Sequence, residues 1–563
     1  MGLLENFKNP CEIKNFDLSK LCDLSQEVRK LIIDTTTKTG GHLASSLGAV
    51  DAIIAMLYCF DFTSDKVIFD VGHQAYAYKI LTDRKNAFKS LRQENGISGF
   101  PLIFESQYDH FTSGHAGDAF AAALGYCYAR DALSKDNFVI TFTGDASFVN
   151  GESLEALLST QKKPKNFLVI LNDNQMSISP NTNAFSRFLC ERQGDLSDKQ
   201  AFLDKFGLNY VGILDGHDIN ALIDAFSAFK NNPVPTLIHI KTLKGKGYKA
   251  AESDSEYYHG VSKDLVTSEN HFADSLSEIL SNRIKNDNKC VCIVAGMAYG
   301  TGTESLQQKF PKNFIDVGIS EDLAVTYASG LALGGLKPIV CIYSTFLQRA
   351  YDQIVTNVCM QKLPVTFLID RAGCTGGDGL THQGIFDTAY LSHVPNMTVL
   401  SPKNSAELED MLDFAQRQSG PVAIRYPNGQ IDNDLPVNKI STDNLWEVIK
   451  DGMGKCILAF GARALNESLL ASKGTDAVVI NARSLKPLDI KMLNRYFDRD
   501  IITVEDGIKN GGFGAMVMHY LNEAGYINSL KIIAFEDKFI SHASVSKQLK
   551  DNKICSEYIK TLL

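Results

Sequence analysis

The stretch that most constrains the fold runs from Gly144 to Ser179 and reads GDASFVNGESLEALLSTQKKPKNFLVILNDNQMSIS. A β-rich run, FVITFT (138–143), comes directly before it. Helix-forming residues then fill 152–161, and FLVIL (167–171) has the composition of a second buried strand. This order predicts a β-turn-α-β unit within a parallel sheet.

Polar side chains stand where each of these two strands is expected to end. Asp145 follows the first strand, and Asn172, Asp173 and Asn174 follow the second. Ligands gather at the carboxyl ends of parallel strands, so Asp145 and Asn174 should converge there, beside a helix N-terminus that can receive phosphate. Two such oxygen ligands suit Mg²⁺ holding a diphosphate.

Either motif alone is most simply an ordinary turn of an α/β sheet. Together and in this order, GDA and NDN resemble the thiamine-diphosphate signature of the transketolase superfamily, with Ala146 where that signature usually has a third glycine. The resemblance implies Mg²⁺ bound by Asp145, Asn174 and the backbone carbonyl of Met176. It also implies that Ala146 and Ser147 lie against the diphosphate.

Composition restricts the class of protein. With 563 residues the chain is too long for one core, and 44% hydrophobic with 21% charged residues is typical of a soluble globular protein. The net charge of -9 argues against nucleic acid or an anionic membrane as the main partner, so a phosphorylated substrate needs a local arginine cluster. We expect a cytoplasmic protein, since no secretory signal or membrane span is evident and the 12 cysteines lack paired spacing.

Three histidines, His42, His73 and His115, each lie next to glycine at the end of an expected strand or loop. Three segments, GGHLASSLG, DVGHQAYAYKILTDR and ISGFP, resemble in this order the 1-deoxy-D-xylulose-5-phosphate synthase family, with Gly41 where the first motif usually begins with serine. The resemblance implies that these histidines line the cavity over the thiazolium ring of the cofactor. HAGDA departs from the serine-rich run that is usual there.

The same resemblance assigns further cofactor contacts in the first half of the chain. It implies that Ala116 and Gly117 lie beside the cofactor, that Tyr248 packs against it, and that His259 of EYYHGV lies near the reacting centre. Lys244 and Lys246 are interpreted as a solvated basic turn.

Glu321 stands after a predicted strand, in ISEDLAVTYASG. Taken alone, it is most simply a helix cap. In context it matches the glutamate common to thiamine-diphosphate enzymes, although Asp322 and Leu323 replace the glutamine and histidine usual in this family. The chemistry needs a carboxyl group in an apolar setting, hydrogen-bonded to the aminopyrimidine ring.

Three further segments match the synthase family: YSTFLQRAYDQ, LIDRAGCTGGDGLTHQGIFD and AIRYPNG. The resemblance implies that Phe346 stacks on the aminopyrimidine, with Tyr343 nearby. Guanidinium groups bind phosphate through two points, and a carboxylate with an imidazole can bond sugar hydroxyls and move protons. The residues assigned in this way to the substrate end are Tyr343, Arg349, Arg371, Asp378, His382 and Arg425.

The alternation of strands and helices predicts an α/β protein of three doubly wound domains, as in transketolases. The expected domains are 1–265 for the diphosphate and Mg²⁺, 285–430 for the aminopyrimidine, and 445–563 for a C-terminal domain that serves dimer packing. Residues 179–207, 262–287 and 431–444 are interpreted as connectors.

For function, the resemblance implies decarboxylation of pyruvate and its joining to glyceraldehyde 3-phosphate, giving 1-deoxy-D-xylulose 5-phosphate and CO₂. Glu321, His42, His73, His259, Asp378 and His382 are the expected catalytic residues. This family supplies isoprenoid, thiamine and pyridoxal synthesis, and the resemblance suggests a homodimer.

Three alternatives remain at this stage. The first is a carboligase or transketolase with another acceptor or donor, which the departures around the reaction chamber favour. The second is a non-catalytic homologue that binds a partner or metabolite. The third, a two-chain acetyl-transferring dehydrogenase, fits less well, because both cofactor-binding units lie in one polypeptide.

Overall fold

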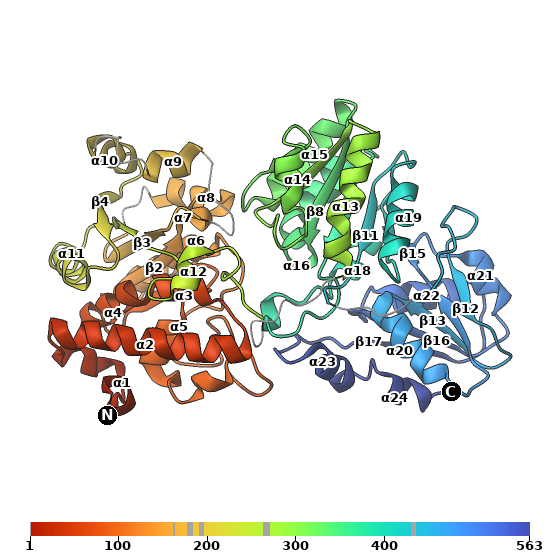
Figure 1. Cartoon of the computed structure of the whole chain (residues 1–563), viewed down its shortest axis with the longest axis horizontal. Helices are drawn as coiled ribbons and strands as arrows, with labels where there is room; N and C mark the ends of the chain where they lie inside the picture. Colours follow the sequence, from red (N-terminus) through yellow and green to blue (C-terminus); the bar gives the residue numbers. More distant parts are fainter. Residues whose placement is uncertain (1, 161–163, 177–183, 191–195, 263–270, 430–434) are drawn as a thin grey trace. The chain divides into compact units, whose positions relative to one another are not determined.

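The computed structural model describes residues 2–160, 164–176, 184–190, 196–262, 271–429 and 435–563 (Figure 1). The chain divides into two compact units, Met1–Thr267 and Ser268–Leu563, and each is described by itself.

Unit 1 is built on one parallel sheet with strand order β1-β2-β3-β5-β4. The sequence prediction around Gly144 is confirmed, because β2 leads through two short helices, α7 and α8, into the neighbouring strand β3. The strands are β1 (Lys66–Phe69), β2 (Val139–Gly144), β3 (Phe167–Asp173), β4 (Asn209–Asp215) and β5 (Thr236–Lys241).

Helices cover both faces of this sheet, as a parallel sheet with strands buried on both sides requires. Alternate strand residues pack on opposite faces: Phe142 joins the cluster formed with α2, α4 and α11, whereas Val139 joins the one formed with α6, α8 and α10. The helices of unit 1 are α1 (Leu3–Asn6), α2 (Leu18–Thr39), α3 (Leu43–Gly48), α4 (Val50–Cys59), α5 (Tyr76–Lys79), α6 (Asp118–Ala132), α7 (Asp145–Phe148), α8 (Gly151–Ser159), α9 (Ala184–Cys190), α10 (Leu196–Asp204), α11 (Ile219–Asn231) and α12 (Lys249–Ser253).

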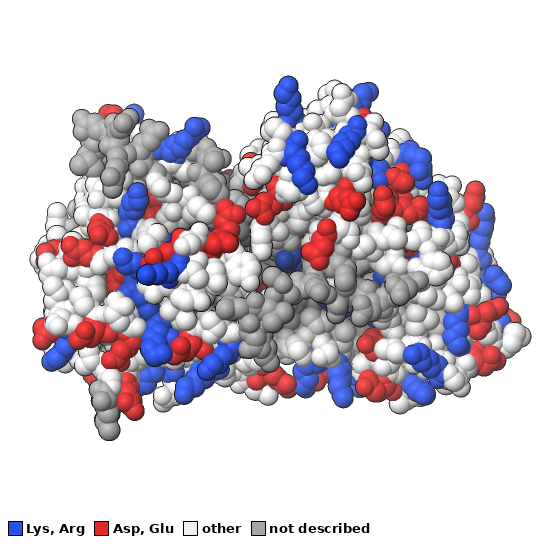
Figure 2. Space-filling view, viewed as in Figure 1, with Lys and Arg blue, Asp and Glu red and all other residues white. Residues whose placement is uncertain are grey.

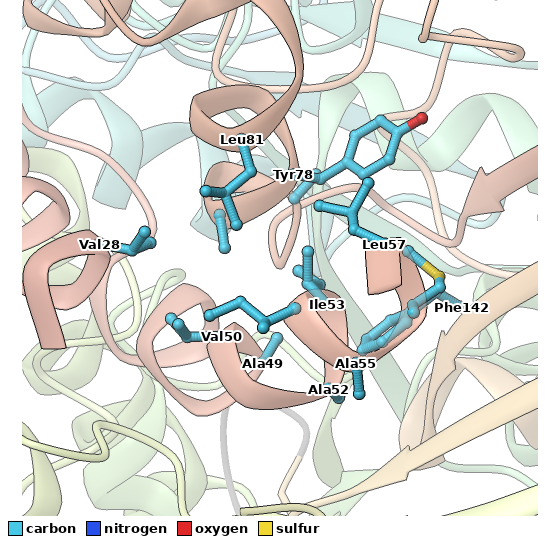
Figure 3. Packing of buried hydrophobic residues seen from close by; sticks show 14 of the residues in the cluster. Val28, Ala49, Val50, Ala52, Ile53, Ala55, Leu57, Tyr78, Leu81 and Phe142 are labelled. Atoms are coloured by element: carbon cyan, nitrogen blue, oxygen red, sulfur yellow. The ribbon is translucent and has the colours of Figure 1, made fainter. Parts of the chain in front are cut away.

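The helix α4 lies at the centre of the first of these clusters (Figure 3). Ile53 and Val50 of α4 are fully buried, together with Val28 of α2 and Tyr78 and Leu81 around the end of α5. A helix that is apolar on nearly every side is stable only inside the protein. This packing fixes the segment just before α4, which carries His42.

Residues 179–207 were expected to be an irregular connector, and this was wrong for the part that the structure describes. That part contains α9 and α10. Phe185, Phe188 and Phe202 pack against one another, with ring centroids 5.4 to 6.2 Å apart. The apolar surface of these rings explains why a polar sequence forms helices here. The rest of that segment lies outside the described residues.

Unit 2 contains two sheets, with strand orders β15-β10-β11-β9-β8-β6-β7 and β12-β14-β13-β16-β17. Together with the sheet of unit 1, they confirm the predicted fold class, an α/β protein with three sheet-based domains of transketolase type. The strands are β6 (Cys290–Val294), β7 (Phe314–Asp316), β8 (Lys337–Tyr343), β9 (Thr366–Asp370), β10 (Thr398–Leu400), β11 (Val422–Arg425), β12 (Glu447–Lys450), β13 (Cys456–Phe460), β14 (Val478–Asn481), β15 (Ser484–Lys486), β16 (Ile501–Ile508) and β17 (Leu530–Phe535).

The two sheets of unit 2 are joined through β15, and residues of both sheets pack in one core cluster. The short strand β15 follows β14 along the chain, yet it pairs antiparallel with β10 of the other sheet. Beside it, buried Arg483 contacts Glu407 at 2.7 Å, and buried Lys403 pairs with both Glu407 and Glu447. These ties across the two sheets explain why residues 268–563 form a single compact unit.

Helices flank both sheets of unit 2. Residues 262–287 were expected to be a linker, but α13 occupies most of that range, and the predicted domain start at 285 falls inside it. The helices are α13 (His271–Asn286), α14 (Glu304–Lys309), α15 (Glu321–Leu333), α16 (Ser344–Leu347), α17 (Tyr351–Gln353), α18 (Asp387–Ser392), α19 (Ser405–Ala415), α20 (Ala462–Ser472), α21 (Ile490–Arg495), α22 (Phe513–Glu523), α23 (Val545–Asp551) and α24 (Ser556–Lys560).

Within the described residues, no helix is both long and apolar enough to cross a lipid bilayer. On the face drawn in Figure 2, acidic and basic side chains are interspersed among the coloured residues.

Candidate active site

The carboxyl edge of the unit 1 sheet brings together the residues predicted to bind metal. Gly144 of β2 is in register with Asn172 of β3, so Asp145 and Asn174 follow adjacent strand ends at the same edge. Asp145 is 3% exposed, and the side-chain oxygen of Asn174 accepts the backbone N–H of Met176 at 3.0 Å. This hydrogen bond holds Asn174 and Met176 in one tight turn after β3.

This edge fits Mg²⁺ in the chemistry of its donors. One buried carboxylate, one amide oxygen and one backbone carbonyl are hard oxygen ligands, and a diphosphate and water could complete the coordination. Over the described part of the chain, no group of three or more His, Cys, Asp or Glu side chains is arranged to hold a metal. The Mg²⁺ site expected here has a single carboxylate, so it is not a group of that kind.

Three of the predicted histidines form a cluster in unit 1. The ring centroids of His42, His73 and His259 lie 5.6 to 6.0 Å apart in all three pairings. His259 reaches this place because Gly41 and Val261 form an antiparallel bridge, which lays the 254–261 segment along the start of α3.

The histidine cluster is half-buried and lies near a positive charge. Burial, with a contribution from Lys244, lowers the pKa of His73 to about 3. Burial likewise places the pKa of His259 well below its usual value, and Lys244 and the two neighbouring histidines add to this effect. Both rings are therefore neutral near pH 7, so they can accept or donate a hydrogen bond without carrying charge.

Lys244 was interpreted as part of a solvated turn, and this was wrong. Its residue is 4% exposed, and burial lowers the pKa of its ammonium to about 8, although Asp145 and Glu256 favour the charged form. A hydrogen bond to a neighbouring segment holds this turn, since the N–H of Leu243 donates to Nε2 of His217 at 2.8 Å. His217 in turn contacts buried Asp51 at 2.9 Å.

The other predicted cofactor residues of unit 1 lie in the same region of the fold. The backbone N–H of Gly117 donates to the carboxylate of Asp70 at 3.0 Å, at the start of α6. Gly117 has a φ of 99°, and a Cβ there would meet the side chain of Asn150, so glycine is required. The remaining residues predicted here are half-buried His115 and Tyr248 and buried Ala116, Ala146 and Ser147.

Glu321 begins α15 in unit 2 and is 3% exposed. Burial raises the pKa of its carboxyl group, although Arg349, whose Nη1 donates to Oε2 at 3.3 Å, works in the opposite direction. Burial therefore favours the neutral form of this carboxyl group more than solvent would. This is the property that the predicted role of Glu321 requires.

An aromatic and cationic stack lies beside β8. The rings of Tyr343 and Phe346 are nearly parallel, with centroids 5.4 Å apart. The guanidinium of Arg371 lies 3.7 Å from the centroid of Tyr343, and its Nη1 donates to the carboxylate of Asp370 and to the carbonyl of Gly300. His382 meets the edge of Phe346 at 5.6 Å. The structure therefore brings together four of the predicted residues: Tyr343, Phe346, Arg371 and His382.

Asp378 and His382 lie on the 373–384 loop, which closes on itself. The backbones of Gly373 and Gly384 exchange two hydrogen bonds of 2.8 Å. Within the loop, Thr381 contacts Nδ1 of His382 at 3.0 Å. Both predicted residues are half-buried, so their side chains retain access to solvent.

Arg425 differs from the other predicted substrate residues. It is 1% exposed, and its guanidinium contacts Asp387 through Nε and Asp506 through Nη1, both at 3.0 Å. Its Nη2 is buried without a hydrogen-bond partner among the described residues. The geometry therefore gives Arg425 a structural ion-pair role, and a phosphate contact requires Nη2 to become accessible.

Sequence reasoning missed several residues that position this site. Asp70 follows β1 as Asp145 follows β2, so an acid after a strand was a usable signal. Arg463 and Gln548 hold the 373–384 loop through its backbone, and their sequence neighbourhood gives no comparable signal.

Comparison with known proteins identifies the family. The family model described as 1-deoxy-D-xylulose-5-phosphate synthase matches residues 4–197 and 191–242. The models for the transketolase pyrimidine-binding domain and the transketolase C-terminal domain match 269–432 and 447–557.

Relatives named 1-deoxy-D-xylulose-5-phosphate synthase match the full length of the chain. The protein from Clostridium perfringens strain 13 is 41% identical over 614 aligned positions, which cover 100% of this chain and 99% of the relative. The protein from Thermus thermophilus is 40% identical and covers 100% and 98%, and the Clostridium acetobutylicum protein is 40% identical and covers 97% and 96%. The resemblance drawn from the motifs is confirmed: this chain belongs to the 1-deoxy-D-xylulose-5-phosphate synthase family.

Proposed function

We propose that this protein is a thiamine-diphosphate-dependent transferase that decarboxylates pyruvate and joins the remaining two carbons to D-glyceraldehyde 3-phosphate. The products are 1-deoxy-D-xylulose 5-phosphate and CO₂. The observation that carries this proposal is the match of 39 to 41% identity to synthases across essentially the whole chain. Bound thiamine diphosphate would supply the electron sink that decarboxylation needs.

In unit 1, the proposal assigns cofactor binding to the sheet edge and the histidine cluster. Asp145, Asn174 and the carbonyl of Met176 would hold Mg²⁺, which binds the diphosphate. The burial of Asp145 and the turn that fixes Asn174 support this assignment. The neutral, closely packed rings of His73 and His259 would exclude water and exchange protons with the reacting groups.

In unit 2, Glu321 would hydrogen-bond the aminopyrimidine ring, and Phe346 would stack on it. The burial of Glu321 and the raised pKa of its carboxyl group support this role. Tyr343 lies parallel to Phe346 and carries Arg371 on its ring, so the stack would extend from the cofactor toward the substrate.

Acceptor binding would fall to Arg349, Arg371, Asp378, His382 and Arg425. Arg349 and Arg371 are partly exposed guanidinium groups suited to the phosphate. Asp378 and His382, from one closed loop, would bond the hydroxyl and carbonyl oxygens of the aldehyde and transfer a proton. Arg425 would contribute through Nη2.

The decisive experiment incubates purified protein, thiamine diphosphate and Mg²⁺ with pyruvate and glyceraldehyde 3-phosphate. We expect equal amounts of CO₂ and a pentulose phosphate with the mass of 1-deoxyxylulose 5-phosphate. Absence of both products, with cofactor binding intact by calorimetry, would overturn the proposal.

A carboligase with a different acceptor is the second candidate. It is favoured by Ala146 in the diphosphate motif and by Asp322 and Leu323 after the glutamate. A panel of phosphorylated and unphosphorylated aldehydes, scored by kcat/KM with pyruvate constant, separates the two candidates. Calorimetry that detects no binding of thiamine diphosphate with Mg²⁺ would instead indicate a non-catalytic homologue.

We also propose that the protein forms a homodimer in the cytoplasm. The most exposed positions of α15 include Leu323 (47% exposed), Tyr327 (45%) and Leu333 (67%), and Met360, further along the same unit, is 69% exposed. A helix with several exposed apolar side chains is typical of an interface. Light scattering should give twice the chain mass, and Leu333→Lys should shift the protein toward monomer.

The cytoplasmic assignment is supported by the cysteines. Those in the described residues are free thiols, and most are buried.

A further inference from the structure

The 373–384 loop, which carries Asp378 and His382, is held by residues far away in the sequence. Gln548 of α23 is 2% exposed and binds both polar groups of Gly376. Its Oε1 accepts the N–H of Gly376 at 3.0 Å, and its Nε2 donates to the carbonyl of Gly376 at 3.2 Å. The same Nε2 donates to the carbonyl of Ser541 at 2.8 Å. The side-chain amide of Gln548 thus accepts one hydrogen bond and donates two, and it connects the loop at Gly376 with the backbone at Ser541.

A second glutamine makes the reciprocal connection. Gln383, which lies on the loop and is 2% exposed, accepts the N–H of Thr375 at 2.8 Å and donates to the carbonyl of Ile540 at 3.2 Å. Gln548 thus reaches from the 540–548 segment to the loop, and Gln383 reaches from the loop to the 540–548 segment. Arg463 adds a third contact, because its Nη1 donates to the carbonyl of Cys374 at 2.6 Å.

Backbone packing leaves the loop little room to move against this segment. Gly376 has a φ of 83°, and a Cβ there would lie 3.4 Å from the carbonyl oxygen of Ala543. Gly379 has a φ of 73°, and a Cβ there would lie 3.3 Å from Cβ of His542. Asp378 directly precedes Gly379, so its backbone lies next to this close approach between the loop and residue 542.

We propose that Gln548 is a positioning residue for the acceptor: it holds the 373–384 loop so that Asp378 and His382 meet the aldehyde. The C-terminal part of the chain, expected from the sequence to serve dimer packing, thereby takes part in substrate specificity. The expected effect on the KM for the acceptor rests on the proposed function, whereas the expected effect on hydrogen exchange in the loop does not.

The principal test is Gln548→Met, which keeps the length and burial of the side chain and removes both hydrogen bonds to Gly376. Losing buried hydrogen bonds of this kind should raise the KM for glyceraldehyde 3-phosphate roughly tenfold or more, with the KM for pyruvate unchanged within about twofold. Hydrogen exchange of the peptide spanning 373–384 should accelerate at least about tenfold.

The matched control is Leu549→Ala on the same helix. Leu549 is buried but makes no hydrogen bond to the loop through its side chain, so the variant destabilises α23 without removing the clamp. We expect a lower unfolding midpoint, unchanged exchange in 373–384 and an unchanged KM for the acceptor. If Gln548→Met does not fold, Gln548→Glu provides the second test, because a carboxylate would repel the carbonyls of Gly376 and Ser541.

Each result decides the inference. Faster exchange in the loop together with a selective rise in the acceptor KM supports it. Unchanged exchange, equal effects of both substitutions, or equal changes in the two KM values would overturn it. If the wild-type protein forms no product from these substrates, the proposed function fails, and exchange in the loop alone decides whether Gln548 is a clamp.

Discussion

Arg425→Met tests whether a residue assigned to substrate is first of all a structural ion pair. Arg425 is buried between two carboxylates, those of Asp387 and Asp506, which are themselves at most 1% exposed in their side chains. Removing the guanidinium of Arg425 leaves the two buried carboxylates without the positive charge that both of them contact. Breaking one buried pair costs about 3 to 5 kcal/mol, so we expect a loss of at least that size in the unfolding free energy of unit 2.

The assay can be confined to unit 2 because the chain has a single tryptophan, Trp446. Its ring is fully buried, its Nε1 donates to the carbonyl of Ser484 at 2.7 Å, and Phe513 lies 5.7 Å away. The change in its fluorescence during urea unfolding therefore reports the unfolding of the two sheets of unit 2. The control is Arg417→Met, an exposed arginine of the same unit, which should cost less than about 0.5 kcal/mol.

The expected loss should depend on pH with a definite sign. Burial already raises the pKa of Asp387 in the wild type, and removing Arg425 raises it further, so the variant gains stability as Asp387 becomes protonated. The loss should thus be smaller at pH 5 than at pH 8. The triple variant with Asp387→Asn and Asp506→Asn should recover most of the stability.

Two results would refute this reasoning. One is a loss below about 1 kcal/mol at pH 8, which would mean that the buried carboxylates do not depend on Arg425. The other is a triple variant no more stable than Arg425→Met. If Nη2 also binds the acceptor, the restabilised triple variant will show a kcat/KM for glyceraldehyde 3-phosphate lowered roughly ten to a hundred times, with little change for unphosphorylated glyceraldehyde.

Three further outcomes follow from the buried ionisable groups. Glu321→Gln should bind thiamine diphosphate with Mg²⁺ by calorimetry but lose at least about a thousandfold in turnover, and near-normal turnover would exclude its role as proton-holding acid. In the wild type, the ring of His73 should show no NMR titration between pH 5.5 and 8. Lys244→Met should raise the pKa of His73, because Lys244 contributes to lowering it. A titration midpoint near 6.5 in the wild type would contradict the lowered pKa. Burial raises the pKa of Glu505 to about 7, so stability should fall as pH rises from about 4.5 to 7, and Glu505→Gln should cost more at pH 5 than at pH 8, by up to about 3 kcal/mol in urea unfolding.

Local patterns were sufficient to predict the strands and helix around Gly144, because each strand there is a short apolar run bounded by turn residues. The histidine cluster could be anticipated only through the family resemblance. His259 lies more than 200 residues after His42, and the two rings meet through the bridge between Gly41 and Val261. Spacing along the chain carries no information about such a contact.

The errors have the same physical origin. Lys244 lies in a glycine-rich basic turn, which locally favours solvent exposure, but His217 and Asp51 hold that turn inside the unit. The contribution of α23 to holding the 373–384 loop was missed because a glutamine is usually a surface residue. Gln548 is buried because it pairs with a peptide group that the sequence does not place near it.

The short strand β15 has a consequence for dividing the chain into separate pieces. A fragment that ends near residue 430 would lack residues 484–486 and would expose the N–H and C=O groups of β10 along an open sheet edge. Such an edge readily recruits strands from other molecules and leads to aggregation. A soluble fragment of this half of the protein therefore has to carry both sheets, and gene fusions or split reporters are better inserted before α13 than between the two sheets.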